Sequence, residues 1–563
     1  VEEIRVPDSW KDLPDEPLEQ TEAAGVPDYV RDVLIPVNAQ AGDKIPVSKF
    51  LSFADGVTEV ETSKYEKRGI AVDVPQWLPD NCIGCNQCSL VCPHAAIRPF
   101  LFTKEEAEQA PAGCITHKAN GRGMENYTFR IQVDPLDCQG CGSCADVCPA
   151  REKALVMKPL ESQMPEQDNW NHCLSLSEKA NPLDKFTVRG SQFQRPLMEF
   201  SGACAGCGET PYMKLMTQLF GERMYIANAT GCAQAMFLSV PSIPMVKDSA
   251  GHGPALSNSL FENNAEYSLG MCLSVDQQRN QVKTHAKAAL DTTSDAALKA
   301  ALESWLQDGD DGDKTRAVSD ALIAALEKAE PTEEGAFVLQ NKEYLTKKSV
   351  WAFGGDGWAY DIGFGGIDHV LAQNRDINML VMDTEVYSNT GGQSSKATPT
   401  AAVAKFAAGG KEVKKKDLGA IAMSYGYIYV AQVAMGYDQA QTLKAIREAE
   451  SYPGPAIVIA YCPCLEHGIK AGMSCTQEEM KKAVECGYWH LYRYDPRRIA
   501  EGKNPFQLDS PAPDTDKLMD FLMGENRFAS LKNNFPDKAD ALYAKEVEDV
   551  KARYAKYKKL AED

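Results

Sequence analysis

The sequence predicts two folded units of different class: a small α+β unit built around cysteine clusters, and a large α/β unit. We expect the α/β unit to hold a parallel sheet with helices on both faces. Two copies of one dense cysteine spacing predict the small unit. Short apolar runs alternate with amphipathic stretches after about residue 201 and predict the large unit, because strands buried on both faces of a parallel sheet are continuously apolar.

Shifts in composition divide the 563 residues into five segments. The first is rich in Pro, Asp and Glu and is expected to be irregular, and the third has the Pro, Gln, Asn and Ser content of a linker. The predicted segments are the irregular N-terminal segment 1–78, the cysteine-cluster domain 79–157, the linker 158–200, the α/β domain 201–500 and the helical tail 501–563.

Apolar periodicity marks the expected strands and helices. One alternating strand, Tyr127–Val133, closes an insertion at 94–137 within the small unit. A charged helical insertion is expected at 275–345, and a charged helix at about 538–560 ends the tail. The strands expected in the α/β unit are Ser349–Phe353, Ile377–Met382, Tyr427–Val433 and Ala456–Ala460.

Charge and composition exclude several classes of protein. The formal net charge of −20 argues against binding to nucleic acid or to an anionic membrane surface. No run of about 18 apolar residues is present, so we expect no membrane span. The opening residues lack the basic and apolar regions of a signal peptide. The 18 cysteines therefore indicate bound metal in a cytoplasmic protein rather than disulfides.

The repeated cysteine spacing is Cys-x2-Cys-x2-Cys-x3-Cys-Pro, which begins at Cys82 and again at Cys138. This spacing is typical of bacterial ferredoxins with two [4Fe–4S] clusters, in which the fourth cysteine of each run binds the other cluster. Zinc sites instead pair two CxxC units, which makes zinc the weaker alternative. The predicted ligand sets are Cys82, Cys85, Cys88 and Cys148 for one cluster, and Cys138, Cys141, Cys144 and Cys92 for the other.

A further group of cysteines lies in the α/β unit. Cys204 and Cys207 form a CxxC pair, Cys232 follows alone, and Cys462 and Cys464 lie together after the last predicted strand. Such a set can hold a cubane cluster or a zinc ion, and the spacing alone favours neither. The cysteines expected to be ordinary buried or surface thiols are Cys114, Cys173, Cys272, Cys475 and Cys486.

Two polar segments follow neighbouring apolar strands. Gly355-Asp356-Gly357 follows the first, and the segment from Thr384 to Asn389 follows the second. Glycines let the backbone approach a diphosphate, and carboxylate, hydroxyl and carbonyl oxygens suit Mg²⁺. The arrangement resembles the thiamine diphosphate motif, with Thr384 and Asn389 in place of its usual Asn-Asn pair. The residues predicted to bind this cofactor are Gly355, Asp356, Gly357, Trp358, Thr384, Glu385, Val386, Tyr387, Ser388 and Asn389.

The order of these motifs resembles the pyruvate:ferredoxin (flavodoxin) oxidoreductase family, specifically the C-terminal half of its single-chain form. The resemblance covers essentially all of the chain. Its most specific segments, besides the paired cysteine runs, are Gly202–Pro211, Gly253–Glu262, Gly354–Gly363 and Thr384–Gln393.

The resemblance implies roles for single residues. It implies that a third [4Fe–4S] cluster, nearest the thiamine, is held by Cys204, Cys207, Cys232 and Cys464. It implies that Mg²⁺ is bound by Asp356, Thr384 and the carbonyl of Val386. Glu209 and Cys232 would lie near the thiamine diphosphate, and Asn389 would lie near the substrate as a catalytic residue.

The family's reaction is the oxidative decarboxylation of pyruvate with CoA to acetyl-CoA and CO2. The resemblance implies that electrons pass from thiamine diphosphate through three clusters to ferredoxin or flavodoxin. The alternatives are another 2-oxo acid as substrate, or an electron-transfer subunit without thiamine chemistry. The family's N-terminal domains supply further catalytic groups, which residues 1–78 do not replace. We therefore expect half of an active site here, an N-terminal half in the same or a separate chain, and a homodimer of the complete enzyme.

Overall fold

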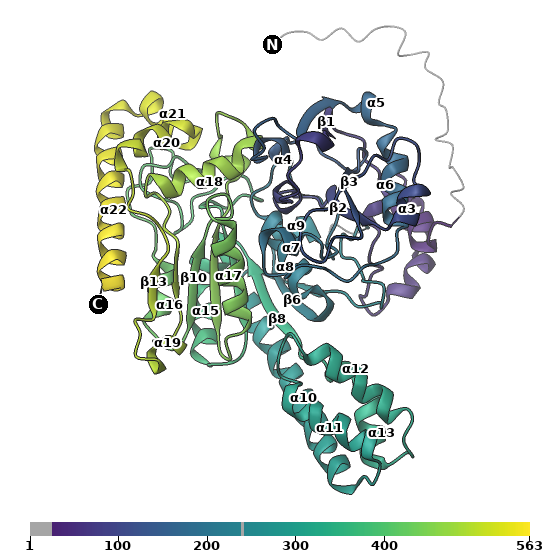
Figure 1. Ribbon diagram of the computed structural model, residues 1–563. Coiled ribbons are helices and arrows are strands. Elements are labelled where there is room, and N and C mark those ends of the chain that lie inside the picture. The colour runs from purple at the N-terminus through teal and green to yellow at the C-terminus, as the bar shows by residue number, and fades with distance from the viewer. Residues whose placement is uncertain (1–24, 238–240, 563) are drawn as a thin grey trace.

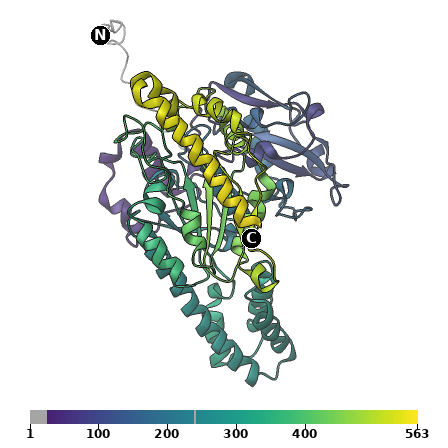
Figure 2. The ribbon, with the colours of Figure 1, turned by 90° about the vertical axis from the view of Figure 1, so that its left-hand side faces the viewer.

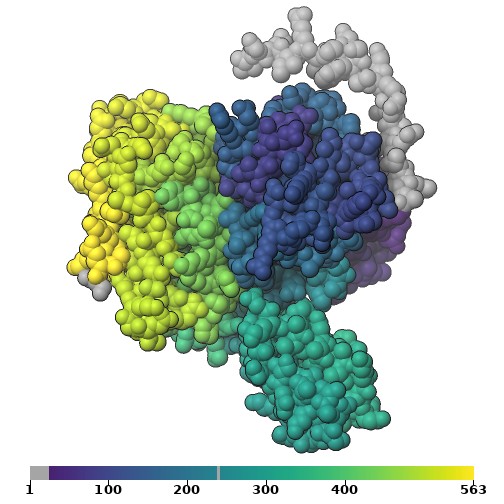
Figure 3. All heavy atoms as spheres, in the orientation of Figure 1, coloured from purple at the N-terminus to yellow at the C-terminus, as the bar shows by residue number. Residues whose placement is uncertain are grey.

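The computed structural model describes residues 25–237 and 241–562. Figure 1 shows a large sheet covered by helices, a cysteine-rich unit beside it, and a helical arm that projects from the molecule. In the space-filling view of Figure 3, the sheet unit and the cysteine-rich unit are pressed together, while the arm stands clear of both. The arm is therefore the part of this chain with the least support from the rest.

The central sheet has eight strands in the order β13-β12-β10-β11-β9-β8-β6-β7. The strands from β10 to β7 run parallel to one another. The short strands β12 and β13 add an antiparallel edge. The strands are β6 (Met224–Ala229), β7 (Ala255–Ser259), β8 (Ser349–Gly354), β9 (Asn378–Asp383), β10 (Tyr429–Val433), β11 (Ala456–Tyr461), β12 (Tyr492–Tyr494) and β13 (Phe506–Leu508).

Burial explains why these strands lack an alternating pattern. Every residue of β8, β9 and β11 is buried, because helices cover both faces of the sheet. Each apolar run predicted for the α/β unit falls on one of the strands β8, β9, β10 and β11. The predicted fold class is confirmed, and the antiparallel edge makes the sheet mixed.

Polar N-caps fix the starts of several helices around the sheet. The side chain of Asp417 accepts a backbone N–H at the start of α16, and Asp438 does the same for α17. These two helices lie against β10 and β11.

Within residues 25–237 and 241–562, no helix is both long and apolar enough to cross a membrane. The helices of the sheet unit are α8 (Thr210–Phe220), α9 (Cys232–Phe237), α14 (Asp356–Tyr360), α15 (Phe364–Ala372), α16 (Leu418–Met423), α17 (Gln439–Glu450), α18 (Thr476–Glu485), α19 (Arg497–Ala500), α20 (Leu518–Gly524), α21 (Asn526–Asn534) and α22 (Pro536–Glu562).

The helical arm begins inside one long helix, α10, which lies along β6 and β8 before it leaves the sheet. The part beyond the sheet has its own apolar core, which includes Leu302, Trp305 and Leu322. This core forms because α11 and α12 pack against each other and α13 packs against α10. The arm helices are α10 (Asn264–Thr292), α11 (Ala296–Asp308), α12 (Thr315–Leu326) and α13 (Glu333–Gln340).

The cysteine-rich unit contains a three-stranded antiparallel sheet, β2-β4-β3, and a two-stranded sheet, β1-β5. Short helices follow the cysteine loops, as expected for an α+β unit of this kind. Its elements are β1 (Asp73–Trp77), α2 (Gln87–Leu90), β2 (Ile97–Phe102), α3 (Lys104–Glu108), β3 (His117–Lys118), β4 (Thr128–Val133), α4 (Ser143–Asp146) and β5 (Leu155–Pro159).

The segments before and after this unit wrap around the sheet unit. Backbone N–H groups of Glu61 and Thr62 donate to the carbonyls of Met245 and Ile243, at 2.7 and 3.1 Å. The predicted N-terminal segment is described only from residue 25 onward. The short helices of these segments are α1 (Ile35–Asn38), α5 (Leu160–Gln163), α6 (Glu166–Leu174) and α7 (Val188–Ser191).

Two predicted boundaries differ from the observed strand pairing. Strand β1 pairs with β5, so the cysteine-rich unit begins before residue 79. Strand β13 pairs with β12, so the large sheet continues past residue 500. Both strands are short, and their partners are distant or weakly patterned. Local composition therefore could not place either boundary.

A buried ion network ties the C-terminal helices to the sheet. The Lys415 ammonium lies 2.7 Å from a carboxylate oxygen of Asp383 and 2.8 Å from one of Glu385. Arg527, in α21, lies 2.9 Å from Glu385. Burial disfavours ionisation of Glu385, but Lys415 and Arg527 outweigh it and lower the pKa of this carboxyl group to about 2. The long helix α22 then runs along the outside of this region (Figure 2).

We predict that Leu302→Ala destabilises the helical arm selectively. Leu302 is fully buried in the arm core, and such a truncation costs about 2–5 kcal/mol. Hydrogen exchange should become faster in α11 to α13 and stay unchanged in β8 and β9. Glu303→Ala, at an exposed position of the same helix, is the matched control. Equal acceleration in the sheet would contradict an independent arm core.

We predict that Lys415→Met lowers the free energy of unfolding of the sheet unit by about 3–5 kcal/mol, because it leaves the Asp383 carboxylate buried without its cation and removes one of the two cations that pair with Glu385. The exposed neighbour Lys414→Met is the control and should unfold like the parent protein. Thermal unfolding of both variants measures the difference. Equal midpoints would show that the Lys415 ammonium is not required.

Candidate functional site

Four predicted site segments meet because their strands are parallel neighbours. Strands β11, β9, β8 and β6 lie side by side in this order. Each is followed at its carboxyl end by one segment: Cys464 after β11, Thr384 after β9, Asp356 after β8 and Cys232 after β6. The carboxyl ends of neighbouring parallel strands share one edge, where ligands of open α/β sheets bind. The fold therefore collects these residues from positions far apart in the sequence.

Asp356 and the segment after β9 are in direct contact. One carboxylate oxygen of Asp356 accepts the Thr384 backbone N–H at 3.2 Å, and the other accepts the Ser395 hydroxyl at 3.0 Å. The Thr384 hydroxyl donates to the Val386 carbonyl at 2.9 Å and lies 3.1 Å from the Ser388 hydroxyl. The structure thus brings together all three predicted Mg²⁺ ligands.

Because this oxygen cluster is buried, an ionised carboxylate within it is energetically unfavourable without a bound cation. Burial, with the nearby Asp383 carboxylate, raises the pKa of Asp356 well above its usual value. A bound divalent cation would favour the ionised carboxylate at this position. The environment of Asp356 therefore fits a metal ligand.

The glycine after Asp356 allows a close approach. A Cβ atom at Gly357 would lie 2.4 Å from the Tyr387 ring, so only glycine fits here. Trp358 is buried directly behind this turn. The turn and the segment after β9 are therefore packed against each other.

Two predicted residues of the second segment lie elsewhere. The Glu385 carboxylate points into the ion network with Lys415 and Arg527, so it supports the segment from behind. Asn389 is exposed to solvent.

His467 is a residue that the motifs did not assign to this oxygen cluster. It is fully buried, and its Nε2 atom lies 2.7 Å from the Thr384 carbonyl, so this nitrogen carries the donated proton. Its Nδ1 atom faces Glu525 at 3.5 Å. Because His467 follows Cys464 in the short 3-10 helix Leu465–His467, it joins the loop after β11 to the segment after β9.

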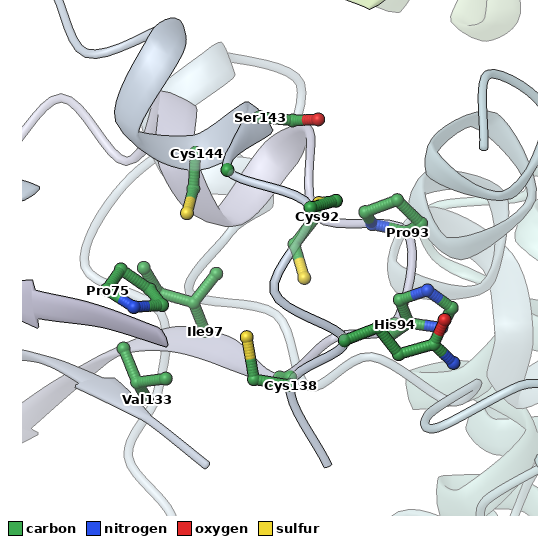
Figure 4. Close-up of a pocket in the computed structure, with 13 residues that line it drawn as sticks. Pro75, Cys92, Pro93, His94, Ile97, Val133, Cys138, Ser143 and Cys144 are labelled. Carbon is green, nitrogen blue, oxygen red and sulfur yellow. The ribbon is translucent and has the colours of Figure 1, made fainter. Parts of the chain in front are cut away.

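The cysteines of the small unit form two sets that match the predicted exchange of ligands. One small cavity is lined by Cys82, Cys85, Cys88 and Cys148. A second is lined by Cys92, Cys138, Cys141 and Cys144. Figure 4 shows the sulfur atoms of Cys92, Cys138 and Cys144 pointing into the second cavity.

One cysteine in each set shows clearly that the thiolate form is unfavourable there without a metal. Burial, together with the neighbouring thiols of each set, raises the pKa of Cys88 and Cys144 well above the usual value. Binding of iron would displace these protons, since thiolates are the metal-binding form. The cavities therefore fit metal clusters better than free thiols.

A buried lysine beside these cavities was missed from the sequence. Lys214 lies in α8, where every residue is buried, and its ammonium donates to the carbonyls of Ser89 and, at 3.1 Å, Leu90. Burial lowers its pKa to about 8, while the nearby thiols of Cys92 and Cys88 act in the opposite direction. A single lysine in the apolar run Tyr212–Met216 was the sequence signal.

The third cysteine group gathers around Glu209. Cys207, Cys232 and Cys464 lie near one another and near this carboxylate, and burial is the largest cause of their raised pKa values. Burial also raises the pKa of Glu209 to about 8. The loops holding Cys207 and Cys464 are in contact, because a Cβ atom at Gly208 would lie 2.5 Å from the Pro463 carbonyl oxygen.

Cys204 would complete this group, and Cys462 is the alternative to Cys464 within it. Cys204 lies near Glu209 at the exposed end of the same loop. Cys462 is fully buried, and its thiol donates to the Ala460 carbonyl at 3.3 Å. Cys464 is partly exposed, and both Cys462 and Cys464 lie near Glu209 and Cys207. The choice of Cys464 over Cys462 stays a prediction.

The third cysteine group adjoins the small unit. The backbone N–H of Gly206, within the CxxC loop, donates to the Cys141 sulfur. The Ser143 hydroxyl also donates to the Met473 carbonyl at 3.4 Å across the same boundary. Cys144 in turn lies near Cys88 of the other set. The set that contains Cys141 and Cys144 therefore lies between the third cysteine group and the set that contains Cys88.

Comparison with known protein families agrees with this division. Residues 313–460 match the C-terminal TPP-binding domain of thiamine pyrophosphate enzymes. Residues 81–151 match a 4Fe-4S dicluster domain, and residues 16–71 match a domain of unknown function. The chain thus carries a thiamine pyrophosphate-binding domain and an iron–sulfur domain.

Comparison with characterised proteins covers the whole chain. It is 54% identical over 564 residues to a pyruvate-flavodoxin oxidoreductase of Klebsiella pneumoniae, and 55% identical over 569 residues to a pyruvate:ferredoxin oxidoreductase of Moorella thermoacetica. Each match covers 100% of this chain and 48% of the relative. A mitochondrial NADP⁺-dependent pyruvate dehydrogenase of Euglena gracilis is 45% identical, with 31% of its length covered.

The chain spans about half the length of these two oxidoreductases, which is consistent with the predicted C-terminal half. The resemblance predicted from the motifs is therefore confirmed, and the chain is related along its entire length to pyruvate:ferredoxin and pyruvate-flavodoxin oxidoreductases.

Proposed function

We propose that this chain forms the cofactor- and cluster-binding half of an enzyme that oxidatively decarboxylates pyruvate with CoA to acetyl-CoA and CO2. The observation that carries the proposal is the shared sheet edge. There the oxygen cluster of Asp356, Thr384 and Val386 lies one strand away from the loops of Cys232 and Cys464. Electrons from a two-electron oxidation can pass one at a time to a cluster only if the cluster lies close to the oxidised group.

The kinds of oxygen gathered here support Mg²⁺ as the bound cation, because carboxylate, hydroxyl and carbonyl oxygens are the hard ligands it prefers. The Thr384 hydroxyl and Val386 carbonyl oxygens are 2.9 Å apart. Asp356 would supply the charged ligand, and the backbone around Gly355 and Gly357 would face the diphosphate.

Bound thiamine diphosphate would supply the electron sink that decarboxylation of a 2-oxo acid requires. The residues of this chain would hold and orient it. The buried network of Asp383, Lys415 and Glu385 fixes the segment after β9, and His467 fixes the Thr384 carbonyl. Glu209 and Cys232 would face the cofactor, and Asn389 would face the substrate.

Three [4Fe–4S] clusters would carry the electrons away. The cluster on Cys204, Cys207, Cys232 and Cys464 would receive them first. Contact between Gly206 and Cys141 supports transfer to the cluster on Cys92, Cys138, Cys141 and Cys144. Proximity of Cys144 to Cys88 supports the last step, to the cluster on Cys82, Cys85, Cys88 and Cys148.

Ferredoxin or flavodoxin would accept electrons from the last cluster, in the cytoplasm. The groups that activate the cofactor and grip the substrate carboxylate would come from the N-terminal half of the enzyme, as a dimer of the complete protein. Pyruvate is preferred over other 2-oxo acids because the two full-chain relatives at 54% and 55% identity carry pyruvate in their names.

We predict that Asp356→Ala in the complete enzyme abolishes retention of thiamine diphosphate and pyruvate oxidation, while iron content stays unchanged. The substitution removes the only charged ligand proposed for Mg²⁺ and leaves the cysteine sets intact. Thiamine and iron analyses after gel filtration measure both quantities. Asp368→Ala is the control. Asp368 lies in α15, away from the oxygen cluster, and its carboxylate accepts a hydrogen bond from the Tyr425 hydroxyl. Equal thiamine retention in both variants would refute the Mg²⁺ assignment.

We predict that Cys464→Ser lowers the iron content of the anaerobically purified enzyme by about one third, because one of three proposed clusters is lost. Cys462→Ser should retain full iron, since this thiol already donates to the Ala460 carbonyl. The reverse result would make Cys462 the ligand instead. Full iron in both variants would place neither cysteine in the cluster.

A further inference from the structure

Two cysteines outside the cluster sets lie in contact with each other. Cys114 belongs to the loop before β3, and Cys173 belongs to α6, so they are distant in the sequence. Both are buried in one small core with Phe102. Their thiols share a hydrogen bond. The sequence alone had indicated two unrelated, ordinary thiols.

Contacts around the pair hold the loop against the helix. Arg130 donates to the Ile115 carbonyl at 2.7 Å and also pairs with Glu166, the first residue of α6. Asn169 of α6 donates to the same Glu166 carboxylate at 3.0 Å. These contacts clamp the residue after Cys114 to the helix that carries Cys173. The approach of the two thiols is therefore built into the packing.

The surroundings favour reaction at Cys114. The hydrogen bond with the Cys173 thiol lowers the pKa of Cys114 below its usual value, against an opposing effect of burial, and Arg130 acts in the same direction as the bond. A lowered pKa raises the fraction of thiolate at neutral pH, and the thiolate is the nucleophilic form. Cys173 is buried but lines an open cavity of about 410 Å³, so a small oxidant would approach the thiol pair from the Cys173 side.

We infer that Cys114 and Cys173 form a reversible oxidation site, at which a peroxide converts the two thiols to a disulfide. The Cys114 thiolate attacks one oxygen of hydrogen peroxide, the O–O bond breaks and hydroxide leaves. The resulting sulfenic acid is attacked by the Cys173 sulfur; its S–O bond breaks, and the thiol proton leaves with hydroxide as water. The two sulfurs are oxidised and one peroxide is reduced.

The site lies beside the wall of a predicted cluster cavity. Trp170 precedes Cys173 by one turn of α6, is fully buried, and packs with Ala96 and Phe200 against Cys92 and Cys138. A disulfide would attach α6 covalently to the loop before β3. It would thereby hold Trp170 in place against Cys92 and Cys138 when peroxide is present.

The test treats the complete enzyme, purified without oxygen, with hydrogen peroxide. Catalase then removes the excess, iodoacetamide blocks free thiols, and peptides are analysed by mass spectrometry without reduction. We expect the peptides of Cys114 and Cys173 to be joined, lighter by two hydrogen atoms, in molecules that retain their iron, and to be separated again by dithiothreitol. In Cys173→Ser, dimedone should trap Cys114 as the sulfenic acid.

Cys486→Ser, which removes another buried thiol, is the matched control and should leave the Cys114–Cys173 link intact. Two results would overturn the inference. One is full alkylation of both thiols in a sample where the partly exposed Cys475 has been oxidised. The other is a link that forms only in molecules that have lost iron, because it would then report unfolding rather than the native contact.

Discussion

The parallel direction of four neighbouring strands is the constraint on which the rest of this structure depends. Because β11, β9, β8 and β6 point the same way, the segments that follow them must meet at one edge. An antiparallel strand in this group would send Asp356 or Cys464 to the opposite side of the molecule. The antiparallel strands β12 and β13 lie at the far edge, where no predicted ligand follows.

Three buried carboxylates lie at this edge, and two of them are paired with cations. Asp356, Asp383 and Glu385 are all buried within a few residues of two strand ends. Lys415 and Arg527 balance two of these carboxylates, whereas Asp356 accepts from a hydroxyl and a backbone N–H and forms no ion pair with any residue that the structure describes. This asymmetry leaves one carboxylate available for a metal ion. Helix α21, which supplies Arg527, therefore supports the segment after β9 through Glu385.

Much of this organisation was predictable because it is local in sequence. Dense cysteine runs, apolar strands and the turn at Gly355–Gly357 each leave a signal within a few residues. The remaining features depend on contacts between distant segments. Strand β1 pairs with β5, Lys415 joins Asp383, and Cys114 meets Cys173 only through the tertiary fold. Glu385 belongs to a recognised motif, yet its carboxylate turns into the ion network, a direction that no spacing encodes.

The central claim is that thiamine chemistry at the sheet edge delivers electrons to the cysteine-bound clusters. The most direct measurement adds pyruvate and CoA, without oxygen, to the complete enzyme and follows the visible absorbance of the clusters. The account predicts bleaching that requires pyruvate and is not reproduced by 2-oxoglutarate. Absence of bleaching with pyruvate, in a sample shown to contain both thiamine and iron, would contradict it.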